Sequence, residues 1–174
     1  RRATRHYTPR RRALGASAMG LDPRPQRPHL RPMFSANVLL IAANVAMFLV
    51  ELVAPRAIDA LALWPLGAGF GPWQVVTYAF LHGGMLHLAF NMFALYMFGG
   101  AVEAVLGTRR YLVYYFVSVV SAALTQLIFA AISGGMYPTV GASGGVFGIL
   151  LAYSIYFPHN RVMLLFPPIP MPAR

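Results

Sequence analysis

The longest stretch without Asp, Glu, Lys or Arg covers residues 111–160 and reads YLVYYFVSVVSAALTQLIFAAISGGMYPTVGASGGVFGILLAYSIYFPHN. A helix needs roughly 20 mostly apolar residues to cross the hydrocarbon of a bilayer, so this stretch is long enough for two such helices. Its middle segment, SGGMYPTVG, is typical of a loop, because clustered glycine and proline interrupt helices. We therefore expect one span over about residues 110–132 and another over about 143–157.

Two further stretches without charge precede this one. They cover residues 32–50 and 60–102 and predict spans over about 36–54 and 84–106. Ser35 is a suitable N-cap for the first of these helices, and Gly107 is expected to end the second. Only 10% of the residues are charged, against about 25% in a soluble domain. The sequence thus predicts an all-α, polytopic transmembrane helical bundle with four spans.

Most of the positive charge lies at the N-terminus. Nine of the fourteen arginines fall within residues 1–31, and the chain has no lysine. Such a tail can bind nucleic acid, and it also resembles a transit peptide. We favour a basic, disordered cytoplasmic tail over residues 1–33, followed by a membrane domain over 34–174, and we expect no nucleic-acid partner.

Four of the five remaining arginines predict the orientation of the spans; the fifth, Arg56, lies in the loop after the first span, which we expect outside. Arg109 and Arg110 lie between the second and third spans, and Arg161 and Arg174 follow the fourth. With four spans, these positions share one side of the membrane with the basic tail. The positive-inside rule makes that side cytoplasmic. We expect an integral, multi-pass protein of a bacterial cytoplasmic membrane, with its N-terminus in the cytoplasm.

Three polar residues fall in the segment LHGGMLHLAFN, residues 81–91, at the outer end of the second span. They are His82, His87 and Asn91. His87 and Asn91 are four residues apart, so they share a helix face. Such side chains can form hydrogen bonds between helices. Ionisable groups within spans, however, mark functional sites by default. Because they lie near the expected depth of Ser143, we interpret them as functional.

Other polar residues of the spans favour structural roles. Glu103 lies near the inner end of the second span, where we expect it to pair with Arg109 or Arg110 or to reach the interface. Asn37 and Asn44 share one face of the first span and are interpreted as packing or capping groups. Cysteine is absent, which excludes disulfides and thiol catalysis.

The segment GASGGVFG, residues 141–148, has two interpretations. Gly141/Gly145 and Gly144/Gly148 are small-xxx-small pairs, which allow close helix packing. The segment also contains G-x-S-x-G, but the soluble-hydrolase elbow requires a preceding strand, which a membrane helix bundle does not offer. A serine at the start of a helix nevertheless has free backbone N–H groups beside it, and these can stabilise an oxyanion.

The expected depth of Ser143 favours the functional interpretation. A helix over residues 143–157 is roughly 22 Å long, whereas the hydrocarbon is about 30 Å thick. If the helix ends at the inner boundary, Ser143 lies several ångströms below the outer one. Non-helical backbone at that depth must be buried in protein or line a water-filled cavity. We therefore expect Ser143 at the floor of a polar pocket open to the outside.

Taken together, these motifs resemble the rhomboid family of intramembrane serine proteases. The resemblance rests on WQVVTYAFLHGGMLHLAFNMFALYMFGGAVEAVLG, residues 73–107, with its H-x-x-x-N, and on GASGGVFGIL, residues 141–150, with its G-x-S-G. It covers about residues 36–174. PPIPMPAR at the C-terminus resembles the family's loop before a fifth span. The resemblance implies a six-span bundle, of which this chain is expected to be an N-terminal part, truncated before spans five and six.

The resemblance also implies roles for single residues. Ser143 matches the nucleophile, and His87 and Asn91 match the side chains that stabilise the oxyanion together with the Ser143 N–H. Gly141 and Gly144 flank the nucleophile and support it. The implied activity is cleavage of peptide bonds in or near the transmembrane segments of other proteins, in the bilayer, with no metal or cofactor.

Three further matches concern supporting residues. His82 resembles a structural histidine near the active site, and Glu103 falls in a G-G-x-x-E stretch with a structural role. Trp73 and Gln74 match a Trp-Arg pair of the first loop, with glutamine in place of arginine.

One departure is the general base, which in the family is a histidine on the sixth span. The only histidine after Ser143 is His159, and it follows the fourth span at the wrong depth. We therefore expect residues 1–174 alone to be inactive. We also expect the face of Gly144 and Gly148 to lack its packing partner.

Two alternatives to a protease remain. A non-catalytic rhomboid-like protein would bind client spans, but such relatives usually lack the serine. A transporter fragment would use His82, His87 and Asn91 to line a path. Such a path predicts polar residues down to the inner face, whereas the second span is apolar from Asn91 to Glu103.

Overall fold

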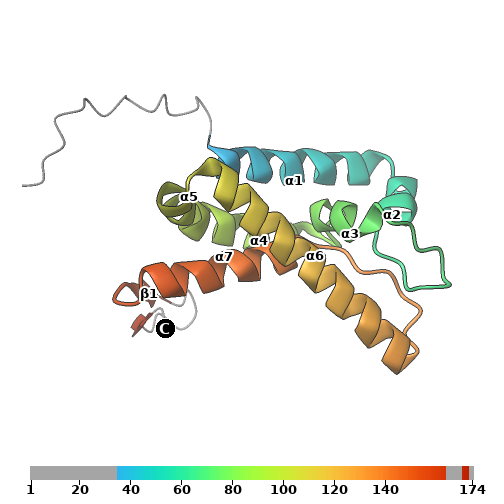
Figure 1. Ribbon diagram of the computed structural model, residues 1–174. Helices are drawn as coiled ribbons and strands as arrows, with labels where there is room; N and C mark the ends of the chain where they lie inside the picture. Colours follow the sequence, from blue (N-terminus) through green and yellow to red (C-terminus); the bar gives the residue numbers. More distant parts are fainter. Residues whose placement is uncertain (1–34, 164–169, 173–174) are drawn as a thin grey trace, which may run out of the picture. The chain divides into compact units, whose positions relative to one another are not determined.

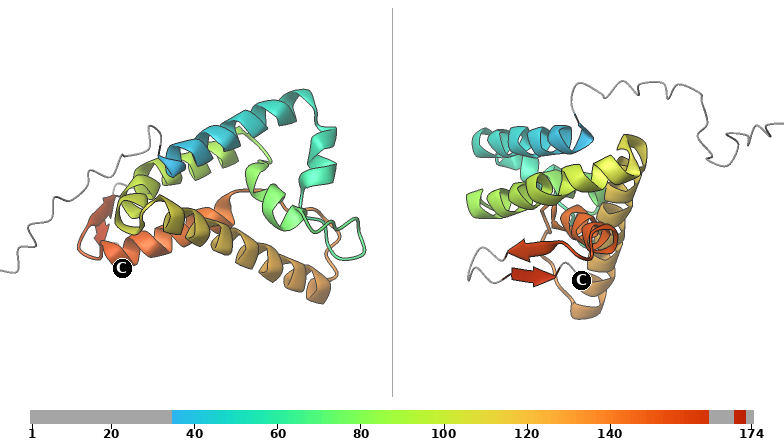
Figure 2. Two further views of the ribbon diagram at one scale, coloured as in Figure 1. Left: turned by 45° about the horizontal axis from the view of Figure 1, so that its top comes forward. Right: turned by 90° about the vertical axis from the view of Figure 1, so that its left-hand side faces the viewer.

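A computed structural model describes residues 35–163 and 170–172 (Figure 1). These residues belong to one compact unit, which Figure 2 shows in two further views. The basic tail expected over residues 1–33 lies outside the described residues, so its boundary stays a prediction.

Helices form nearly all of the regular structure in the described residues. In chain order they are α1 (Ala36–Val53), α2 (Arg56–Leu61), α3 (Gln74–Thr77), a 3-10 turn (Tyr78–Phe80), α4 (Met85–Ala94), a π-helical turn (Leu95–Gly99), α5 (Gly100–Leu106), α6 (Thr108–Ser133) and α7 (Ser143–Tyr156). Each predicted span therefore appears as a helix within about two residues of its expected bounds. Two short strands that the sequence analysis did not predict, β1 (Arg161–Met163) and β2 (Pro170–Pro172), pair antiparallel after α7.

Three of these helical segments are long and apolar enough to cross a membrane: Ala36–Val53, Met85–Leu106 and Thr108–Ser133. The fourth, α7, is a shorter apolar helix of 14 residues. Large apolar side chains such as Leu49, Phe90 and Ile132 are exposed on the outer faces of the long helices. Exposed apolar surface on this scale marks a membrane-facing protein, and the chain is a helical membrane bundle.

Two polar side chains hold the beginning of α1. The Ser35 hydroxyl accepts a hydrogen bond from the Val38 N–H, which confirms it as the N-cap. The Glu103 carboxylate, buried on α5, accepts the N–H groups of Ala36 and Asn37 at 2.9 and 3.0 Å. A carboxylate is favoured there because the first N–H groups of a helix lack intrahelical partners and carry a partial positive charge.

Glu103 makes no ion pair with Arg109 or Arg110 among the described residues, so that part of the expectation is wrong, and its reach to the interface stays a prediction. Its remaining contact is with Thr108, whose hydroxyl donates to Oε1 at 2.9 Å. Glu103 therefore has the expected structural role, but it joins α5 to α1 and α6. The sequence alone did not indicate this partner, because Glu103 and the start of α1 are more than sixty residues apart along the chain.

Asn37 joins α1 to the π-helical turn. Its side-chain amide donates to the Leu95 carbonyl at 2.9 Å and accepts the Tyr111 hydroxyl at 2.7 Å. A Cβ at Gly99 would overlap the Asn37 amide, whereas a Cβ at Gly100 would meet nothing within 4 Å. The glycine at position 99 thus allows α1 to approach the second span closely.

We expect Gly99→Ala to destabilise the protein by about 1–3 kcal/mol, the usual cost of overpacking a tight interior. The matched variant Gly100→Ala should be neutral or slightly stabilising, because alanine is the better helix former and the site is open. Thermal unfolding in detergent measures both. Equal melting temperatures for the two variants would contradict the close contact between Gly99 and Asn37.

The small residues of α7 pack against α6. A Cβ at Gly144 would lie 2.5 Å from the Ala122 Cβ, and one at Gly148 would overlap Ser118. The expectation that this face lacks its partner is therefore wrong. Ser118 and Ala122 are themselves small and four residues apart on α6, so both helices contribute to the close approach. The side of α7 left open in this chain carries Phe147, Leu151 and Ile155, which are exposed.

Candidate functional site

Ser143 is the first residue of α7, and its position is fixed by the loop that precedes it. Thr139 pairs with Leu63 of the first loop through two backbone hydrogen bonds, of 2.9 and 3.0 Å. The Gly141 N–H donates to the Tyr78 carbonyl at 2.9 Å. The loop is thus held on both sides of the turn into α7. The N-cap, Ala142, has no side chain that could satisfy the first N–H groups of the helix, which leaves them for a ligand.

Gly141 brings Ser143 and His87 to one place. Its φ is +130°, a conformation that favours glycine. A Cβ at this position would lie 2.6 Å from His87 Cε1, 2.9 Å from His87 Nε2 and 3.7 Å from Ser143 Oγ. The imidazole and the hydroxyl therefore border the same small space, which only glycine leaves open. No hydrogen bond joins Ser143 Oγ to either histidine within the described residues.

Asn91 lies one turn after His87 on α4 and is buried. Its side-chain amide donates to the His87 carbonyl at 2.9 Å. An amide nitrogen carries two hydrogens, so this bond leaves Asn91 a second donor. The bond also fixes the direction of the side chain along the same helix face as His87.

His82 lies ahead of α4 and packs against His87. The two ring centroids are 5.2 Å apart at an interplanar angle of 62°. Both ring nitrogens of His82 are buried and have no hydrogen-bond partner among the described residues. Burial, with repulsion from His87 as a smaller cause, lowers the pKa of His82 to about 4. His82 is therefore neutral at physiological pH.

The sequence analysis missed Glu51, which holds the backbone of His82. Glu51 is buried on α1, and its carboxylate accepts the His82 N–H at 3.0 and 3.2 Å. It thereby fixes the loop that carries His82 against His87. The available signal was an acid inside an apolar span, which by default marks a functional or structural site.

Gln74 and Trp73 stabilise the first loop. Gln74 is almost fully buried; its side chain accepts the Trp64 N–H at 3.1 Å and donates to the carbonyls of Ala60 and Gly69. The Trp73 indole N–H donates to the Ala60 carbonyl at 2.9 Å. At the position where the family resemblance implies arginine, a neutral glutamine amide thus provides the hydrogen bonds to the loop backbone.

The remaining expectations concern His159 and metals. His159 is exposed beyond the end of α7, at the opposite end of that helix from Ser143. Within residues 35–163 and 170–172, no group of three or more His, Cys, Asp or Glu residues could hold a metal ion.

These residues could together stabilise a negative charge beside Ser143. The backbone N–H groups at the start of α7, the His87 imidazole and the Asn91 amide are all hydrogen-bond donors. Donors that are fixed in advance around a developing oxyanion lower the barrier to acyl transfer. The arrangement offers a serine hydroxyl near the His87 imidazole, and no base is hydrogen-bonded to that hydroxyl among the described residues.

Comparison with known proteins extends this picture. A family model described as a rhomboid domain matches residues 70–173. The chain is 32% identical over 142 residues to rhomboid protease GluP of Bacillus subtilis, covering 78% of this chain and 27% of that protein. It is 33% identical over 122 residues to rhomboid protease GlpG of an Enterobacter species, covering 68% and 42%. It is 33% identical over 99 residues to rhomboid protein 1, mitochondrial, of Saccharomyces cerevisiae, covering 56% and 29%. The chain thus spans less than half the length of these relatives.

Proposed function

Because the chain belongs to the rhomboid family of intramembrane serine proteases, we propose that the complete protein is an intramembrane serine endopeptidase. Its substrates are other membrane proteins, cut in or near their transmembrane segments. The observation that carries the proposal is the shared space beside Gly141, where the Ser143 hydroxyl and the His87 imidazole meet.

Ser143 Oγ attacks the substrate carbonyl, and the resulting oxyanion accepts hydrogen bonds from the Ser143 N–H, His87 and Asn91. Gly141 leaves room for His87 next to the nucleophile. Gly144 seats the start of α7 against Ala122 of α6. His82 supports His87 from the side, and Glu51 fixes His82. The base takes the Ser143 proton and passes it to the leaving nitrogen as the peptide C–N bond breaks, which gives an acyl-enzyme and a free amine. Water, deprotonated by the same base, then hydrolyses the acyl-enzyme.

The general base is a histidine beyond residue 174, on a sixth span, as the family resemblance implies. A serine hydroxyl is a weak nucleophile without an adjacent base. The family resemblance assigns His87 to the oxyanion, and His87 makes no hydrogen bond to Ser143 Oγ among the described residues. The inactivity of residues 1–174 alone follows from this assignment and stays a prediction.

The two rival functions make different demands on the same residues. A client-binding protein without activity would not need an accessible Ser143 hydroxyl. A transporter would need polar groups along the second span, but its inner acid, Glu103, is committed to the start of α1. Both rivals predict that Ser143 is chemically inert.

We expect a fluorophosphonate probe, which reacts with activated serines, to label the complete protein at Ser143. The reason is that the proposed base and oxyanion site activate this one hydroxyl. Labelled peptides identified by mass spectrometry measure the result, and Ser154, at the other end of α7, should remain unlabelled. An unlabelled Ser143 in folded, complete protein would favour the rivals.

We further propose that the N-terminus is cytoplasmic and that the loop between α1 and α3 is outside. The support is the position of Arg109 and Arg110 at the start of α6, on the same side as the start of α1. Alkaline phosphatase fused after Arg31 should be inactive, and fused after Ala68 it should be active. The opposite pattern would overturn both the orientation and the outward opening of the site.

A further inference from the structure

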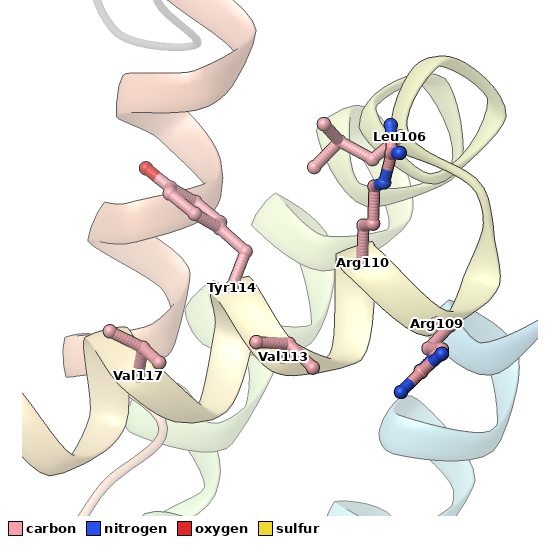
Figure 3. Close-up of a pocket in the computed structure, with 6 residues that line it drawn as sticks. All are labelled: Leu106, Arg109, Arg110, Val113, Tyr114 and Val117. Atoms are coloured by element: carbon pink, nitrogen blue, oxygen red, sulfur yellow. The ribbon is translucent and has the colours of Figure 1, made fainter.

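Two adjoining hollows lie on an exposed side of α6, away from Ser143. The first measures about 460 Å³ and is lined by Leu106, Arg109, Arg110, Val113, Tyr114 and Val117 (Figure 3). The second measures about 490 Å³ and is lined by Leu112, Val113, Phe116, Val117, Val120 and Ser121. The two hollows share Val113 and Val117, and the surface formed by their lining residues is here called the α6 groove.

The α6 groove has a basic end and an apolar body. In Figure 3 the side chain of Arg110 points toward Leu106, whereas that of Arg109 leaves the helix in a different direction; both residues line the first hollow. Beyond them the lining is aliphatic or aromatic as far as Ser121. Tyr114 turns its hydroxyl away to the Gly148 carbonyl, at 3.0 Å, so its ring borders the groove as apolar surface.

The two arginines have no acidic partner among the described residues. The chain has four acids, and three of them lie in the described residues. Glu103 is bonded to the start of α1 and to Thr108, and Glu51 is bonded to His82. Asp59 lies on α2, beyond the opposite end of α1. The positive charge at this end of the groove is therefore available to an anion.

The length of the α6 groove matches one leaflet of a bilayer. Eleven residues separate Arg110 from Ser121, which corresponds to about 16 Å along a helix. The hydrocarbon of a bilayer is about 30 Å thick, so one leaflet is about half of that. A molecule that fills the groove therefore carries an anion at the interface and an apolar chain reaching the midplane.

We propose that the α6 groove is a binding site for an anionic glycerophospholipid. The phosphate lies at the end of the groove that Arg109 and Arg110 line, and one acyl chain lies along Val113 and Val117 toward Ser121. The lipid stabilises α6 and, through the close packing of α6 on Gly144 and Gly148, the seat of Ser143. The site is independent of the proposed proteolysis, since none of its residues borders Ser143.

The test is a lipid titration of the complete protein in a neutral detergent, followed by its melting temperature. Phosphatidylglycerol should raise the melting temperature at lower concentration than phosphatidylcholine does. An arginine near an anionic lipid surface contributes a factor of about five. The Arg109→Gln/Arg110→Gln double variant should therefore bind phosphatidylglycerol about 25-fold more weakly, while its response to phosphatidylcholine is unchanged.

Two matched controls test whether the loss of binding comes from the charge at positions 109 and 110 and from filling the groove. The alternative is an effect that any lost arginine or any added tryptophan would have. Arg56→Gln removes one arginine at the other end of the spans and should keep the full preference. Val117→Trp, which fills the groove, should weaken phosphatidylglycerol binding, while Ile128→Trp, on exposed surface of the same helix, should not. Equal responses to the two lipids in the unchanged protein would overturn the proposal. So would an equal loss in Arg56→Gln, or equal stabilisation by inorganic phosphate alone.

Discussion

Ser143→Ala should abolish proteolysis by the complete protein while leaving its melting temperature unchanged. The Ser143 hydroxyl makes no hydrogen bond within the described residues, so its removal leaves no buried group unpaired. Loss of the nucleophile in a soluble serine protease costs on the order of 10⁶ in kcat. Cleavage of a membrane-embedded substrate by purified protein measures the effect, and we expect no product above background.

The matched control is Ser154→Ala, on the same helix but near its other end. The Ser154 hydroxyl donates to the Leu151 carbonyl of its own helix and contacts nothing in the site. This variant should cleave at the normal rate. If Ser143→Ala still cleaves at the normal rate, another residue is the nucleophile and the assignment of Ser143 is wrong.

The helices could be predicted from the sequence because a membrane span is a local property. Long stretches without charge set the spans, and local signals set their ends. Ser35 caps α1 and Gly107, with a φ of +76°, ends α5, as their residue types indicated. Membrane insertion demands that each span satisfy its own backbone, so little information from elsewhere in the chain is needed.

The contacts between helices could not be predicted in the same way. Glu103 and Glu51 are both acids in apolar spans, and their residue type gave no partner. Each proved to bind backbone N–H groups of another segment, at the start of α1 and at His82. The periodicity of Gly144 and Gly148 likewise showed a close-packing face, but only the structure identified α6 as the helix that fills it.

The geometry around Ser143 depends on both kinds of information. The sequence indicated which side chains belong to the site, because His87 and Asn91 share a helix face. It did not indicate that His87 lies against the Gly141 backbone, since that contact joins α4 to the loop before α7. Gly141 therefore has a more specific role than general support, because it leaves room for the His87 imidazole, and a substitution tests this role directly.

Gly141→Ala should slow proteolysis at least about 100-fold, because a displacement of about 1 Å in an active site costs that much. A methyl group here would lie 2.6 Å from His87 Cε1, so the imidazole must move. The φ of +130° also strains any residue with a Cβ, by about 1–3 kcal/mol. The rate should therefore fall much further than the fraction of folded protein, when both are measured on the same sample.

Gly83→Ala is the matched control for this variant. A Cβ at Gly83 would meet only Val140, at 3.9 Å, which is an ordinary contact. It adds the same methyl group next to His82 in the sequence, yet it should leave the rate unchanged. If both variants cleave normally, the space beside Gly141 is not needed for catalysis, and His87 does not act where the structure places it. If Gly141→Ala alone is slow but remains folded, the shared space of Ser143 and His87 is the feature on which the reaction depends.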